Sequence, residues 1–219
     1  MEPSKQTLDL PTAPVTAQHP AVFFTTFDAP GAGAGPGQGT NTALATGINP
    51  AGVIAGCIID ANNVGHGYVR ASDGTITTYS VSGAGTAPGQ GTICSSINPA
   101  GETTAPYVDA SGVNHGYVRA PDGTITTFNV PGAGTAPGQG TLAGTNNQAG
   151  AIVGQEIDSN GVGHGFLRAP DGAITTFDVP GAGTSAGQGT FPTTNNPVDA
   201  VTGWEIDSSG VAHGFLPTP

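Results

Sequence analysis

The chain repeats itself with a period of 49 residues, and this repetition constrains its fold more than any other feature of the sequence. A Thr-Thr-aromatic motif, followed by a glycine-rich stretch, occurs four times. These motifs begin at Thr25, Thr77, Thr126 and Thr175, and the first interval is longer because the first unit has about three extra residues near Asn41 to Ala43. A His-Gly-aromatic motif also occurs four times, at His66, His115, His164 and His213. Periods of about 40–50 residues are typical of repeat arrays such as propellers. The sequence therefore predicts four copies of one unit.

Each unit contains four short apolar runs separated by turn residues. In the third unit these runs cover residues 141–146, 151–158, 163–168 and 173–179. The separators are of the Asx-Gly and Pro-Asp-Gly kind, which supply the positive φ angles that tight hairpins require. None of the runs has the length or the period of a helix. We expect every unit to be a four-stranded antiparallel meander.

The two ends of the chain predict how the four units are arranged. The fourth unit stops soon after Phe215 and Leu216, where the other units continue into one more strand. A segment with the sequence of that strand occurs at residues 22–29. Pairing the segment beside Phe215 and Leu216 would complete the last unit and remove the free sheet edges. An open solenoid would need polar caps, and we identify none. The predicted fold is therefore all-β: a four-bladed β-propeller of 49-residue repeats, closed by the N-terminal strand.

The domain organisation follows from this arrangement. Residues 1–21 lack the apolar core of a signal peptide and are expected to form a flexible leader. Residues 22–219 are expected to form a single propeller domain. Its blades cover approximately residues 40–79, 91–128, 140–177, and 189–219 together with 22–29.

Composition and charge exclude several classes of partner. The chain has 37 glycines and 19 prolines, but only 9% of its residues are charged, which is too few for a typical disordered chain. A net charge of −11 disfavours contact with nucleic acid or anionic lipid. No segment is long and apolar enough to suggest membrane insertion. Two cysteines, Cys57 and Cys94, do not define a disulfide framework, and we expect them to be reduced.

The repeated motifs resemble those of the bacterial extracellular HAF repeat family. The resemblance lies in the His-Gly-aromatic motifs, in the upstream pairs Ile48-Asn49 and Ile97-Asn98, and in the run Val53-Ile-Ala-Gly56. It covers nearly all of the chain after residue 21. The chain departs from the family pattern where glycine replaces an alanine of the motif, and where Asp-Val-Pro-Gly-Ala-Gly replaces a leucine-rich element. The resemblance implies an exported, propeller-like protein, extracellular or periplasmic, and no defined activity.

Two sets of repeated polar residues suggest metal sites, but turn formation explains both. Each repeated histidine adjoins a glycine at the start of a third strand, where it is expected to hold a turn by hydrogen bonding. Four aspartates open the turns before these strands, as Asp158 opens Asp-Ser-Asn-Gly161. This resembles the beginning of a calcium loop, but Ala169 stands where a bidentate glutamate would be needed. Arg70 and its two repeat equivalents each precede an aspartate by three residues, which predicts ion pairs at the hairpin ends. We expect no metal and no cofactor.

Binding residues are sought first in the glycine-rich connectors. Each connector carries one glutamine, and these are Gln38, Gln90, Gln139 and Gln188. A side-chain amide offers both a donor and an acceptor, which suits a hydroxyl-rich ligand. Packing within the loop would explain the same residues.

A second group of candidates lies where the units differ. At one position of the second strand the units carry Cys57, Pro106, Gln155 and Trp204, and at the next position they carry Ile58, Tyr107, Glu156 and Glu205. Such variation in a uniform strand predicts either a recognition surface or relaxed packing. Trp204 with Glu205 would form a sugar-stacking pair. The candidate ligand-binding residues of this group are Tyr107, Glu156, Trp204 and Glu205.

No catalytic motif is present in the sequence: there is no nucleophile elbow and no His-Glu-x-x-His motif. The sequence therefore predicts a non-catalytic exported protein that binds glycans or another cell-surface ligand in the manner of a lectin. The first alternative is a structural module that docks onto a protein partner or forms a homo-oligomer, and the second is a propeller enzyme that acts on glycosides.

Overall fold

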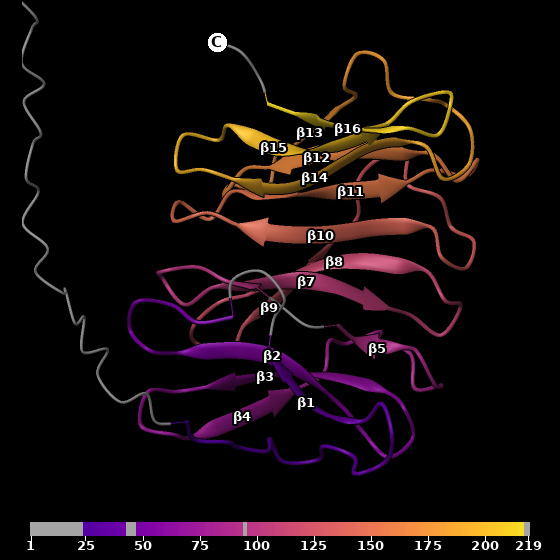
Figure 1. Cartoon of the computed structure of the whole chain (residues 1–219). Coiled ribbons are helices and arrows are strands. Elements are labelled where there is room, and N and C mark those ends of the chain that lie inside the picture. The colour runs from indigo at the N-terminus through magenta and orange to yellow at the C-terminus, as the bar shows by residue number, and fades with distance from the viewer. Residues whose placement is uncertain (1–23, 43–46, 94–95, 217–219) are drawn as a thin grey trace, which may run out of the picture.

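The protein is an all-β molecule built from four stacked units. A computed structural model describes residues 24–42, 47–93 and 96–216. Within this part of the chain there are sixteen strands in one sheet and no helix. The units follow one another from indigo to yellow in Figure 1. The all-β class and the repeated antiparallel meander are thus confirmed.

The strands recur in the same order in each unit. The first unit contains β1 (Gly39–Thr42), β2 (Ile54–Ile59), β3 (Gly65–Arg70) and β4 (Ile76–Tyr79). The second contains β5 (Gly91–Thr92), β6 (Ser96–Ile97), β7 (Thr103–Val108), β8 (Asn114–Arg119) and β9 (Ile125–Phe128). The third contains β10 (Gly140–Asn146), β11 (Ile152–Ile157), β12 (Gly163–Arg168) and β13 (Ile174–Phe177). The fourth contains β14 (Gly189–Asn195), β15 (Val201–Ile206) and β16 (Ala212–Phe215).

Turn chemistry sets the hairpin between the third and fourth strands of a unit. Asp73 accepts a hydrogen bond from the backbone nitrogen of Thr75 at 2.8 Å, and Gly74 between them has a φ of 94°. Only glycine adopts such an angle without strain. Gly123 and Gly172 have φ angles of 94° and 96° at the same place in the next two units. The Asp-Gly pairs are therefore the cause of the regular hairpin spacing.

Neighbouring units are joined by a strand that contacts both of them. The strand β4 pairs with β3 of its own unit, while its Tyr79 ring packs edge-on against Tyr117 of the second unit, with centroids 6.2 Å apart. Phe128 and Phe166 make the same contact at 6.1 Å. Buried clusters centred on Tyr117 and Phe166 lie at these two junctions, and a third cluster, centred on Tyr68, includes Phe27 from the segment before the first unit. The core is therefore divided into separate clusters.

A ladder of asparagines runs along the stack. The side-chain nitrogen of Asn49 donates to the carbonyl of Asn98 at 3.4 Å, and Asn98 donates to the carbonyl of Asn147 at 3.1 Å. Asn147 in turn donates to the carbonyl of Asn196 at 2.9 Å. Each step spans 49 residues, so one asparagine per unit fixes the register of the next unit.

The sheet is not closed, so the four-bladed propeller is not confirmed. The path of paired strands begins at β1 and ends at β16, which lie at opposite ends of the stack in Figure 1. The predicted pairing of residues 22–29 with Phe215 and Leu216 is not found among the described residues; positions 22 and 23 lie outside them. Phe27 instead packs against Tyr68 of the first unit, and Ala29 is buried in the same cluster. Phe27 packs on the first unit because the aromatic ring of each Thr-Thr-aromatic motif packs on the unit that follows it in the chain.

Two further expectations were wrong. Cys57 is disulfide-bonded rather than reduced; Cys94, the only other cysteine of the sequence, lies outside the described residues. The arginines form no ion pairs with the hairpin aspartates in the described chain. Each lies instead over the aromatic ring of the Thr-Thr-aromatic motif that precedes its own unit, as Arg168 lies 5.0 Å from the ring centre of Phe128. Burial of the arginine stem against the neighbouring unit favours this placement.

Candidate functional site

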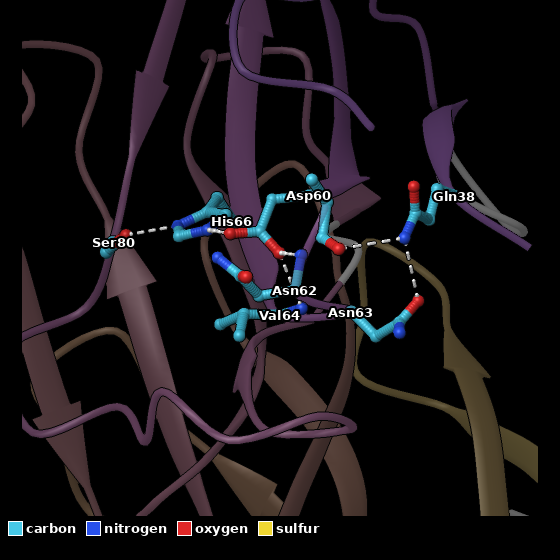
Figure 2. A network of polar contacts seen from close by, with 8 residues as sticks. Gln38, Asp60, Asn62, Asn63, Val64, His66 and Ser80 are labelled. Carbon is cyan, nitrogen blue, oxygen red and sulfur yellow. Dashed lines mark hydrogen bonds and ion pairs between the residues drawn. The ribbon is translucent and has the colours of Figure 1, made fainter. Parts of the chain in front are cut away.

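An aspartate at the end of the second strand organises one polar turn in every unit. Oδ1 of Asp60 accepts hydrogen bonds from the backbone nitrogens of Asn62 and Val64 at 2.8 and 2.9 Å. The Val64 amide is the main cause that holds the pKa of Asp60 below its ordinary value. Figure 2 shows this turn with Gln38 on one side and His66 on the other. The predicted role of these aspartates in turns is confirmed.

The repeated histidine joins this turn to the fourth strand. Nε2 of His66 lies 3.3 Å from Oδ2 of Asp60, and its Nδ1 lies 2.8 Å from the hydroxyl of Ser80 (Figure 2). In the second and third units, Asn129 and Asp178 take the place of Ser80, at 2.7 and 2.8 Å from the histidine. The predicted hydrogen bonding of the histidines to a turn is confirmed. The sequence analysis did not single out the residue 14 positions after each histidine.

An open cleft adjoins the Asp–His pair in the first and third units. The cleft of the first unit has a volume of about 390 Å³ and includes Ile58, Asp60, His66 and Ser80 in its lining. The third-unit cleft has about 400 Å³. It is lined at equivalent positions by Gly132, Glu156, Asp158, His164, Thr176, Phe177 and Asp178. The repeat therefore produces the same hollow twice, with different chemistry.

One of the two positions that vary between units lies beside this histidine. In the second unit Tyr107 stacks on His115, with ring centroids 5.0 Å apart, and a smaller hollow of about 110 Å³ lies beside His115 and Asn129. In the first unit the position is Ile58, which gives an apolar floor. In the third and fourth units it is a glutamate, Glu156 or Glu205. The variation at this position changes the polarity of the cleft from unit to unit.

Glu156 is the unusual group of the third cleft. It is 4% exposed, and its Oε2 has no hydrogen-bond partner among the described residues. Burial raises the pKa of this carboxyl above its ordinary value. A buried carboxylate oxygen without a partner costs free energy unless a ligand or a proton satisfies it.

The imidazole of His164 stands among three carboxyl groups. Its Nδ1 lies 2.8 Å from Oδ1 of Asp178, and its Nε2 lies 3.8 Å from Oδ2 of Asp158. Partial burial lowers the pKa of His164, but the hydrogen bond and charge of Asp178, with the charges of Glu156 and Asp158, outweigh it and raise the pKa. The cleft thus offers several acceptors and a titratable donor beside the Phe177 ring.

The four connector glutamines are engaged within their own loops. Oε1 of Gln38 accepts from the backbone nitrogen of Gly35 at 2.8 Å, and its Nε2 donates to the carbonyl of Ala61 at 3.1 Å. Gln90 and Gln139 make the same pair of contacts, and Oε1 of Gln188 accepts from the nitrogen of Ser185. The Nε2 contacts of Gln38, Gln90 and Gln139 tie these connectors to a neighbouring turn, so these three side chains have little hydrogen-bonding capacity left for a ligand.

Trp204 and Glu205 are not brought together. They are neighbours on β15, so their side chains point to opposite faces of the sheet. Trp204 stacks on Phe191 at 5.9 Å and is 43% exposed, whereas Glu205 is buried. The two positions therefore belong to different surfaces of the sheet.

Metal binding finds no geometric support in residues 24–42, 47–93 and 96–216. No three His, Cys, Asp or Glu side chains of this part of the chain are grouped in a way that would hold a metal ion. The same residues contain no helix of the kind that spans a membrane.

Neither the comparison with protein-family models nor the comparison with curated proteins gives a match. The resemblance to the HAF repeat family therefore stays a prediction.

Proposed function

We propose that the protein is a non-catalytic binding module that takes a hydroxyl-rich ligand, such as a surface glycan, into the cleft of its third unit. The observation that carries the proposal is Glu156, whose buried Oε2 has no partner among the described residues at the edge of an open cleft. A sugar hydroxyl would donate to this oxygen. Asp158 and Asp178 would accept further hydroxyl donors.

The wall of the cleft also suits a sugar ring. Phe177 and Thr176 line the same hollow as the carboxylates. Aromatic rings stack on the apolar faces of sugars while acceptors on the rim bind their hydroxyls. The proposal does not need a closed propeller, because the strands of one unit and the connector before it form each cleft.

We also propose that the protein works outside the cytoplasm, in an extracellular or periplasmic setting. The disulfide-bonded state of Cys57 supports this, because disulfides persist mainly in oxidising compartments. The resemblance of the repeats to an exported family agrees with it.

A glycan array printed at several densities, followed by calorimetry on the best saccharide, tests the proposed function. Replacing Glu156 with isoleucine gives the third unit the residue that the first unit has naturally at this position, which limits the structural disturbance. Loss of a hydrogen bond to a charged acceptor should weaken binding by about tenfold or more.

Glu205→Ile is the matched control, measured on monomeric protein. Glu205 is also buried with an unpartnered Oε2, but the described part of its unit has no strand equivalent to 174–177. The control should bind like the unmodified protein. Absence of any saccharide signal, or equal losses in the two variants, would refute the proposal.

A further inference from the structure

The outer face of the fourth unit is exposed where the corresponding faces of the other units are covered. Val211 is 51% exposed, whereas its equivalents Val64, Val113 and Val162 are 5–6% exposed. Trp204 and Leu216 on the same unit are 43% and 70% exposed. We call the surface formed by Trp204, Val211, Gly214 and Leu216 the end face.

The end face corresponds to a unit-to-unit interface that exists inside the chain. Trp204 pairs directly with Gly214, so both lie on one side of the sheet. The equivalent of Gly214 in the third unit is Gly165, and a Cβ placed on Gly165 would come within 2.9 Å of Pro192 of the fourth unit. The end face is thus equivalent to the surface that each of the first three units uses to contact the next unit. The described residues supply no partner for it.

The edge of β16 lacks the strand that its equivalents have. The strands β3, β8 and β12 each pair with a following strand, whereas β16 pairs only with β15 among the described residues. Its histidine shows the same deficit. Nδ1 of His213 has no partner in the described chain, although each of its three equivalents has one at 2.7–2.8 Å.

The other end of the molecule carries the missing element. Residues 25–28 have the sequence Thr-Thr-Phe-Asp, identical to residues 175–178 of the third unit. Phe27 is already packed on Tyr68, as such rings pack on the unit that follows them. Its backbone forms no strand pair among the described residues. The two ends lie at opposite ends of the stack in Figure 1, so this segment does not reach β16 of its own chain.

We propose that a second copy of the chain docks head-to-tail on the end face and pairs its residues 25–28 with the edge of β16. The register follows from β12 and β13, where Gly165 pairs with Phe177, and Leu167 with Thr175. Gly214 therefore pairs with Phe27 of the second copy, and Leu216 pairs with Thr25 of the second copy.

The junction completes a binding cleft. Asp28 of the second copy takes the position that Asp178 has beside His164, and so supplies the partner of His213. Thr26 and Phe27 of the second copy take the positions of Thr176 and Phe177. With Glu205 and Asp207 they reproduce the residue set of the third cleft.

The asparagine ladder continues across the same junction. Asn196 is exposed, and its amide nitrogen has no acceptor among the described residues. Its Oδ1 holds the turn as the other asparagines do. The carbonyl of Asn49 of the second copy is the acceptor that the repeat predicts. This docking does not depend on the proposed glycan binding.

Such an interface joins two different surfaces and does not close on itself, so it produces open chains of copies rather than a dimer alone. The net charge of −11 on each copy opposes the association. Salt screens this repulsion. Association should therefore increase with protein concentration and with ionic strength.

Cysteine cross-linking tests the register. A chain carrying Thr25→Cys and Leu216→Cys, two exposed positions, is oxidised mildly with the Cys57 disulfide intact. We expect a ladder of disulfide-linked oligomers that fades on dilution. The control carries Thr25→Cys and Ser209→Cys, which is exposed in the same unit but outside the register, and it should give at least fivefold less cross-linked product. A cross-link within one chain, or no cross-link, would overturn the proposal.

Sedimentation velocity on the full chain provides the independent measurement. Val211→Asp places a charge on the end face and should abolish the rise in mass with concentration and salt. Ser208→Asp adds the same charge at an exposed position of the adjacent turn and should leave that rise unchanged. A chain that associates only after removal of residues 1–21 would identify this segment as the occupant of the end face and overturn the proposal.

Discussion

Phe27 packs edge-on against Tyr68, with ring centroids 6.0 Å apart and planes inclined at 78°. The same contact joins Tyr79 to Tyr117, Phe128 to Phe166, and Phe177 to Phe215. The N-terminal segment therefore belongs to the junction below the first unit. It repeats a contact that occurs at every internal junction.

Phe27→Ala should destabilise the protein by about 2 kcal/mol, because it removes an aromatic contact and the ring beneath Arg70. Chemical denaturation of the full chain measures the change. Phe24, three residues before Phe27 and 89% exposed, is the control, and Phe24→Ala should be neutral within about 0.5 kcal/mol. Equal effects of the two substitutions would contradict the assigned packing.

Asn147→Ala should cost about 1–3 kcal/mol more than Asn196→Ala in monomeric protein. Both side chains accept hydrogen bonds from two backbone nitrogens of their turn at 3.0 Å. Only Asn147 is buried and donates to the next unit. The difference in free energy of unfolding between the two variants therefore measures what the hydrogen bond from Asn147 to the next unit contributes. A difference near zero would show that the asparagine ladder does not hold the units together.

Glu156→Gln should stabilise the folded protein at neutral pH. Burial raises the pKa of Glu156 in the folded state, so folding favours the protonated carboxyl. The stability that this residue contributes is fully present below the unfolded pKa near 4.5 and is lost as pH rises through the folded pKa. Glutamine does not titrate. The advantage of the variant should thus be absent below about pH 4.5 and grow above it. The free energy of unfolding of both proteins is measured below and above this pH. An equal difference between the two proteins at every pH would contradict the account.

Cys57→Ser should lower the free energy of unfolding by roughly 2–4 kcal/mol, the usual effect of losing a native disulfide. Thermal unfolding with and without a reductant gives the comparison. The unmodified protein should lose stability on reduction, and the variant should not respond. A variant that is as stable as the oxidised protein would mean that the crosslink contributes nothing.

The sequence predicted the units well because the turns are local. The run at 163–168 coincides with β12, and the Asp-Gly turns lie where they were expected. Ring closure was not predictable, because a Thr-Thr-aromatic strand such as β4 pairs with one unit and packs on the next. The same motif can therefore pair with the strand before it or pack its ring on the unit after it. Residues 24–29 make the second kind of contact, which the sequence alone does not distinguish from the first.

The candidate site was predicted in part. Variation between units drew attention to Glu156, which lines the third cleft. Asp178 was missed, although Ser80 and Asn129 at the equivalent positions also show variation. Its contact with His164 depends on the pairing of β12 with β13, which brings together residues 14 positions apart. The glutamines matched the expected composition of a binding loop, but their hydrogen bonds are made within the fold.

The distance between the two ends of one chain tests the open stack most directly. Spin labels at Thr25→Cys and Leu216→Cys are measured by electron paramagnetic resonance in protein diluted until it is monomeric. The open stack predicts no dipolar broadening, because Leu216 follows β16, whereas Thr25 is close in sequence to Phe27, which packs on the first unit at the other end of the stack. A closed ring would place them on paired strands about 5 Å apart, and strong broadening in the monomer would contradict the account.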